Sequence, residues 1–68
     1  MSVAKVLEIT ASSAESFEDA IGQGISRATE SVDDVRGAWI NEMNVVIEKG
    51  KIKEYRVNMR VTFVLKSK

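Results

Sequence analysis

The sequence predicts an α+β fold in which one helix packs on a three-stranded antiparallel sheet, in the order β-α-β-β. Two observations carry this prediction. From Lys51 to Lys66, polar and apolar residues alternate with hardly a break, which is the period of a half-buried strand. Between about residues 16 and 33, apolar residues instead recur at helical spacing. With 68 residues, no proline and no repeat, the chain is expected to form a single domain over residues 1–68.

Two further strands complete the predicted sheet. The segment from Val3 to Thr10 is rich in β-branched residues and predicts a short first strand, followed by a turn over Ala11–Ala14. The segment from Val35 to Glu48 predicts the second strand. Lys49–Gly50 then predicts a hairpin turn, because Gly50 can adopt the positive φ that a tight hairpin requires.

The start and the packing face of the helix also carry signals. Ser16, followed three residues later by Asp19, resembles a capping box at a helix start. Gly22 and Gly24 each lower the helix propensity by about 1 kcal/mol relative to alanine. We therefore expect these glycines to serve close packing against the sheet or a neighbouring subunit, rather than to bind a ligand.

The alternation of the last strand assigns its two faces. One face is expected to contact the helix residues Phe17, Ile21, Ile25 and Ala28, because only one face of each element can be buried within one chain. The helix-facing side chains are expected to be Tyr55, Val57, Met59, Val61 and Phe63. The opposite face is expected to carry Arg56, Asn58, Arg60 and Trp39.

The length of the last strand predicts self-association. A strand of about fifteen residues spans about 50 Å, whereas a helix of about eighteen residues spans about 27 Å. The helix cannot cover the whole apolar stripe, so another copy of the chain is expected to cover the remainder. The chain has no cysteine, and a core of this size supplies only about 3–5 kcal/mol, which also favours an oligomer.

Composition argues against several classes of function. Ten basic residues balance ten acidic ones, so nucleic acid is not an expected partner. No apolar run approaches about twenty residues and the first residues do not resemble a signal peptide, so we expect no membrane association and a cytoplasmic location. The chain has neither histidine nor cysteine and no recognisable catalytic motif, so it is not expected to be an enzyme.

A few polar residues could bind a ligand or could serve structure alone. Asp33–Asp34 could mark a metal site, but adjacent carboxylates at a helix end more often face solvent. Three glutamates, Glu42, Glu48 and Glu54, are expected to pair across strands with Arg56, Arg60 or Lys53. Trp39, the sole tryptophan, could stack on a planar ligand, although packing is the commoner role of a strand tryptophan.

Four segments together resemble the dodecin family: VAKVLEI, SAESFEDAI, ATESVDDV and KIKEYRVNMRVTFVLK. The similarity extends from Val3 to Leu65 without a gap and agrees with the β-α-β-β order. Dodecins are small flavin-sequestering proteins. The resemblance implies a homododecamer, a hollow shell of cubic 23 symmetry with its helices outside, that binds a small-molecule ligand.

The resemblance also implies three flavin-site positions, at which this chain departs from the family pattern. The family's flavin-stacking tryptophan aligns with Gly37, and Trp39 lies two residues further on, about 6.5 Å along the same strand face. The family's flavin-binding glutamine aligns with Arg56. The implied cofactor is riboflavin or FMN; because a guanidinium only donates hydrogen bonds, FMN is favoured.

The alternative is a shell that binds another ligand or is purely structural. That ligand could be a divalent cation such as calcium, coenzyme A, or an anion attracted by Arg36, Arg56 and Arg60. The sequence does not identify the residues of any metal site, because a site on a symmetry axis needs only one residue per chain.

Overall fold

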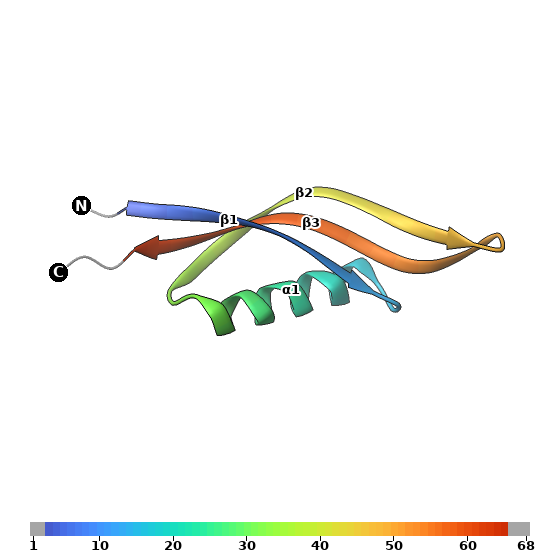
Figure 1. Ribbon diagram of the computed structural model, residues 1–68, viewed down its shortest axis with the longest axis horizontal. Helices are drawn as coiled ribbons and strands as arrows, with labels where there is room; N and C mark the ends of the chain where they lie inside the picture. Colours follow the sequence, from blue (N-terminus) through green and yellow to red (C-terminus); the bar gives the residue numbers. More distant parts are fainter. Residues whose placement is uncertain (1–2, 66–68) are drawn as a thin grey trace.

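The last strand lies at the centre of the sheet. The structure, a computed structural model that describes residues 3–65, contains β1 (Val3–Ser13), α1 (Phe17–Ser31), β2 (Val35–Glu48) and β3 (Lys51–Leu65). The three strands are antiparallel in the order β1-β3-β2, and α1 covers one face of the sheet (Figure 1). The predicted fold class and element order are therefore confirmed; Lys66, the last residue of the predicted third strand, lies outside the described residues.

The first strand is longer than predicted, and the turn expected over Ala11–Ala14 is wrong for its first three residues. β1 continues to Ser13, which pairs with Tyr55. The long central strand offers a continuous row of hydrogen-bonding partners, and this tertiary context overrides the weak β propensity of the small residues. The Ser13 side chain is buried, and its hydroxyl accepts a hydrogen bond from Glu15 N (2.9 Å) and donates one to Asp19 Oδ2 (2.6 Å).

The helix begins as predicted and ends two residues early. Ser16 is the N-cap, and its Oγ accepts a hydrogen bond from Asp19 N at 2.9 Å. The Asp19 carboxylate accepts hydrogen bonds from the Ser13 and Gln23 side chains. It does not accept one from the backbone N–H of Ser16, so the second hydrogen bond of a capping box is not formed. The helix ends at Ser31 because Val32 is extended (φ −132°, ψ 152°).

The hairpin turn has the geometry that the sequence predicts. Lys49 and Gly50 both have positive φ, 54° and 77°. Two such residues form the type I′ turn, whose twist matches that of the flanking strands. The Glu48 and Lys53 side chains then pair across the hairpin at 3.5 Å, as the sequence predicts for this glutamate.

The core lies between α1 and the middle of β3. Val57, Met59 and Val61 are fully buried, and they pack with Ala20 and Ala28 of the helix. The residues packed at the margin of this core include Phe17, Ile21, Ile25 and Ile9. The rings of Phe17 and Tyr55 meet edge to face, with centroids 5.1 Å apart. The predicted helix-facing register is therefore confirmed, and Arg56 and Arg60 are exposed on the opposite face.

One helix glycine is required by this packing and the other is not. A Cβ on Gly24 would lie 2.8 Å from Met59 Cε and 3.1 Å from Ala11 Cβ, so the helix touches the sheet here. A Cβ on Gly22 would meet nothing within 4 Å. Within one chain, the close packing against the sheet therefore belongs to Gly24 among the described residues, and packing of Gly22 against a neighbouring subunit stays a prediction.

Both ends of the sheet extend beyond the helix. The molecule measures 54 × 19 × 13 Å, whereas a 15-residue helix is about 22 Å long. Figure 1 shows the β2–β3 hairpin reaching past one end of α1 and the ends of β1 and β3 reaching past the other. Large apolar side chains are exposed at both ends: Ile47 and Ile52 on the hairpin, Val3 and Leu65 on the opposite end.

Candidate functional site

The sheet face opposite the helix carries the candidate site. β1 and β2 flank β3, so on this face Arg56, Asn58, Arg60 and Thr62 each have a neighbour on either side. Arg60 is paired with Trp39 of β2 and with Glu8 of β1. Trp39 is 65 % exposed, which is unusual for the largest apolar side chain of a small protein. Its aromatic surface is therefore available to a ligand or to another copy.

Gly37 and Trp39 lie on the same face, next to an open hollow. They are paired with Thr62 and Arg60, two residues apart on β3 with no irregularity between them. The hollow has a volume of about 380 Å³ and is lined by Arg36, Gly37, Ala38, Trp39 and Thr62. A Cβ on Gly37 would meet nothing within 4 Å, so the missing side chain is part of what leaves this space open.

Arg56 lies on the same face but not beside Trp39. It is paired with Asn44 of β2, and it precedes Arg60 by four residues, about 13 Å along the strand. Within one chain, the structure thus brings together two of the three predicted positions, Gly37 and Trp39. The basic side chain that lies beside Trp39 is Arg60.

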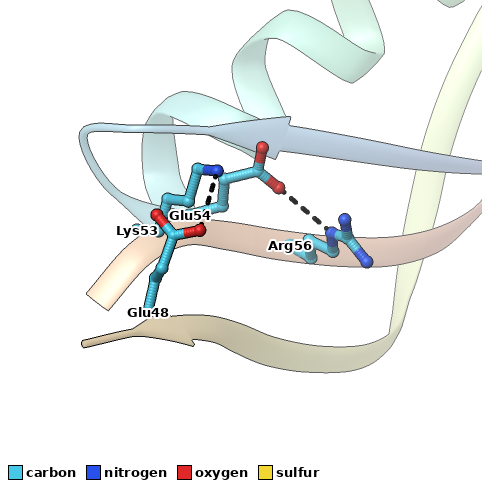
Figure 2. Close-up of polar contacts among 4 residues, drawn as sticks. All are labelled: Glu48, Lys53, Glu54 and Arg56. Atoms are coloured by element: carbon cyan, nitrogen blue, oxygen red, sulfur yellow. Dashed lines mark hydrogen bonds and ion pairs between the residues drawn. The ribbon is translucent and has the colours of Figure 1, made fainter. Parts of the chain in front are cut away.

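The three arginines of the sheet differ in how fully their donors are occupied. Arg36 makes two hydrogen bonds to the Asp34 carboxylate, at 2.7 and 3.3 Å, and this contact raises the pKa of the Arg36 guanidinium. Arg56 donates to Glu54 at 3.2 Å along the same strand, not across strands as the sequence suggested (Figure 2). Arg60 lies 3.9 Å from Glu8, an ion pair without a hydrogen bond among residues 3–65.

A β-bulge shapes the middle of this face. Between Ile40 and Glu42 the register of β2 against β3 shifts, so that Asn41 is an extra residue in the strand. Asn41 Nδ2 donates to Asn58 Oδ1 at 2.9 Å, and Asn58 Nδ2 donates to Thr10 Oγ1 at 3.0 Å. This chain of hydrogen bonds joins all three strands directly beside the Trp39–Arg60 pair.

Acidic groups on the site face are dispersed rather than clustered. Glu42, expected to pair with a basic residue, lies opposite Asn58 and makes no ion pair within residues 3–65. Asp33 is exposed, and Asp34 contacts Arg36. No group of three or more acidic residues that could hold a metal ion is present within the described part of one chain.

The sequence reasoning missed Glu8 and Asn41. Glu8 is a charged residue in a mainly apolar strand, and in the structure it lies on the same sheet face as the polar residues of β3. The residue that lies beside Glu8 depends on the order of the strands in the sheet. Asn41 depends on the bulge, which the imperfect alternation between Val35 and Glu48 signals without locating it.

Comparison with known proteins identifies the class. A model of the dodecin family matches residues 3–66, so the chain belongs to the dodecin family. Dodecins are small-ligand-binding proteins and not enzymes, which confirms the expectation that this chain is not a catalyst. In residues 3–65, no helix has both the length and the apolar character needed to cross a membrane.

Two relatives, one of them compared both by sequence and by structure, show how similar the chain is to known dodecins. The chain is 35 % identical to calcium dodecin of Mycobacterium tuberculosis over 66 residues, covering 97 % of this chain and 93 % of that protein. The crystal structure of that calcium dodecin, described as having a novel calcium-binding site, matches with a TM-score of 0.82 at 37 % identity, covering 94 % and 91 % of the two chains. The crystal structure of a mutant of the Thermus thermophilus dodecin matches with a TM-score of 0.94 at 28 % identity over 100 % of both chains.

Proposed function

We propose that twelve copies of this chain form a closed shell that sequesters a small ligand on the sheet face opposite the helix. The observation that carries the assembly is the apolar surface left uncovered at both ends of the sheet, where Ile47 and Ile52 are 63 % and 51 % exposed. Burial of such side chains stabilises by about 1.5–3 kcal/mol each, so a second copy is the natural cover. Family membership supports twelve as the number.

A divalent cation such as calcium is the first ligand candidate. The support is the 35 % identity to calcium dodecin. Calcium takes six to eight oxygen ligands, and the site face offers carboxylates and side-chain amides, among them Glu8, Glu42 and Asn58. Because one described chain has no cluster of three acidic residues, the cation would have to be shared between copies.

A flavin, riboflavin or FMN, is the second candidate, and Trp39 is the observation that favours it. An exposed indole beside an open hollow is a stacking surface, and two copies could enclose one ring between them. Two residues argue against strong flavin binding. Gly37 supplies no aromatic ring, and the Arg56 side chain is hydrogen-bonded to Glu54.

Two titrations on the assembled protein separate these candidates. After treatment with a chelator, calorimetry with Ca²⁺ is expected to show binding that Mg²⁺ does not reproduce, since Mg²⁺ demands a tighter octahedral site. Glu42→Gln should weaken that binding, whereas Glu18→Gln on the exposed helix surface is the matched control. Absence of calcium binding at millimolar concentration, together with unquenched riboflavin fluorescence, would contradict a sequestering role.

A further inference from the structure

The polar sheet face contains one place where an aromatic surface and free hydrogen-bond donors lie side by side. Trp39 and Arg60 are directly paired residues of β2 and β3, and the Cβ atoms of such pairs lie about 4.5–5.5 Å apart. Both side chains are accessible: Trp39 is 65 % exposed and the Arg60 side chain 51 %. A ligand lying on the indole would therefore have the guanidinium at its edge.

Among the three arginines of the sheet, Arg60 is also the one whose donors are least occupied. Arg36 and Arg56 each hydrogen-bond a nearby carboxylate, at 2.7 and 3.2 Å. The contact of Arg60 with Glu8, at 3.9 Å and with both side chains about half exposed, is too long for a hydrogen bond. Exposed ion pairs of this kind are weak, so an incoming anion can displace Glu8.

An open hollow lies beside Trp39. The hollow of about 380 Å³ is lined by Gly37, Thr62 and Arg36 among others, and not by Arg60; the Arg36 guanidinium is hydrogen-bonded to Asp34. A Cβ added to Gly37 would touch nothing within 4 Å. A planar group could therefore lie flat along the strands against Trp39. The neighbouring bulge fixes β2 to β3 through the 2.9 Å bond from Asn41 to Asn58, which holds the pair in position.

We infer that Trp39 and Arg60 form a subsite for an aromatic anion, a planar ring that carries a phosphate or carboxylate, and that Arg60 sets the preference for the charged ligand. This inference rests on the proposed ligand-binding role of the same sheet face. Stacking on Trp39 supplies affinity for any flat ring, whereas charge-assisted hydrogen bonds from Arg60 distinguish an anion from its neutral counterpart. The assignment replaces Arg56 by Arg60 as the residue that recognises the charge.

The test uses riboflavin and FMN as probes, because they share one ring system and differ by a phosphate. Trp39 is the sole tryptophan of the chain, so quenching of protein fluorescence reports on this subsite directly. The assembled wild-type protein is expected to bind FMN at least tenfold more tightly than riboflavin, with a preference that falls as salt is raised. Arg60→Gln should reduce the FMN-to-riboflavin ratio to about one, mainly through loss of FMN affinity.

Arg27→Gln is the matched control, since it removes the same group from the helix, where the Arg27 side chain is 85 % exposed and lies 3.9 Å from Glu30. It should leave the ratio within about twofold of wild type. Equal binding of the two probes by wild type, an unchanged preference in Arg60→Gln, or no quenching by either probe would overturn the inference. Native mass spectrometry of the same sample tests the proposed shell, and the Ca²⁺ titration tests the proposed cation binding. A failure of either proposal can therefore be told apart from a failure of the Trp39–Arg60 subsite.

Discussion

The contrast between Gly24 and Gly22 yields a sharp prediction about how the helix is held against the sheet. Both residues lie in α1 between Phe17 and Ser31, so replacing either by alanine gains about 1 kcal/mol of helix propensity. At Gly22 nothing lies within 4 Å of the new methyl group. Gly22→Ala should therefore stabilise the protein by about 1 kcal/mol.

At Gly24 the same gain is opposed by overpacking. The new methyl group would lie 2.8 Å from Met59 Cε and 3.1 Å from Ala11 Cβ. Met59 is fully buried, so its terminal methyl group can move only within the core, and Ala11 is held in β1 by its pairing with Val57. Overpacking of this kind destabilises by about 1–3 kcal/mol. After the propensity gain, Gly24→Ala should be destabilised by up to about 2 kcal/mol.

The gain in helix propensity is common to both variants. The difference between their free energies of unfolding therefore gives the cost of overpacking at Gly24, about 1–3 kcal/mol. The assay is urea denaturation at one fixed protein concentration, since an oligomer's apparent stability depends on concentration. Midpoints that shift equally in both variants would refute the close contact between α1 and the sheet. A Gly24→Ala variant that is more stable than the wild-type protein would refute it as well.

Other substitutions test the cap, the core and the candidate site. Ser16→Ala removes the acceptor of the 2.9 Å cap hydrogen bond and should destabilise by about 0.5–2 kcal/mol in urea; an unchanged midpoint would contradict the cap. Met59→Ala empties a fully buried position and should lose about 2–5 kcal/mol, and a loss below about 1 kcal/mol would place Met59 outside the core. Gly37→Trp should fold, because a Cβ meets no neighbour there, and should raise riboflavin affinity at least tenfold by fluorescence titration; unchanged affinity would show that position 37 does not face the ligand.

The sequence predicts the elements of this fold because its two periodicities are unusually clean. The alternation of β3 assigns Val57, Met59 and Val61 to the core, and all three are fully buried. The N-cap Ser16 and the turn residue Gly50 act through local chemistry, so their roles are visible without the tertiary structure. Local signals of this kind predict local structure.

The same reasoning fails where structure depends on non-local pairing. The extension of β1 to Ser13 follows from the length of β3, which offers partners beyond the point where local propensity ends. The separation of Arg56 from Trp39 follows from the register of β2 against β3, which pairs Trp39 with Arg60 and Asn44 with Arg56. The shift at Asn41 and the one between Val46 and Ile47 cancel, so the predicted Lys49–Gly50 turn already places Arg60 opposite Trp39. The family resemblance, and not this register, led to Arg56.

The candidate site is predictable only in its residue types. An exposed tryptophan on a polar strand face indicates a ligand or an interface, but the residues that accompany it come from three strands: Trp39, Arg60 and Glu8. Their grouping requires the strand order β1-β3-β2, which antiparallel alternation does not determine. Contributions from neighbouring copies add residues that no single chain reveals.

Native mass spectrometry of the intact protein at micromolar concentration tests the central claim most directly. Twelve copies of a 7.5 kDa chain give a particle of about 90 kDa, and we expect this species to dominate because the exposed apolar ends of the sheet are then covered. Ile47→Asp should reduce its abundance, since a charge placed on the hairpin surface opposes burial between copies. A wild-type protein that remains monomeric or dimeric would contradict the account.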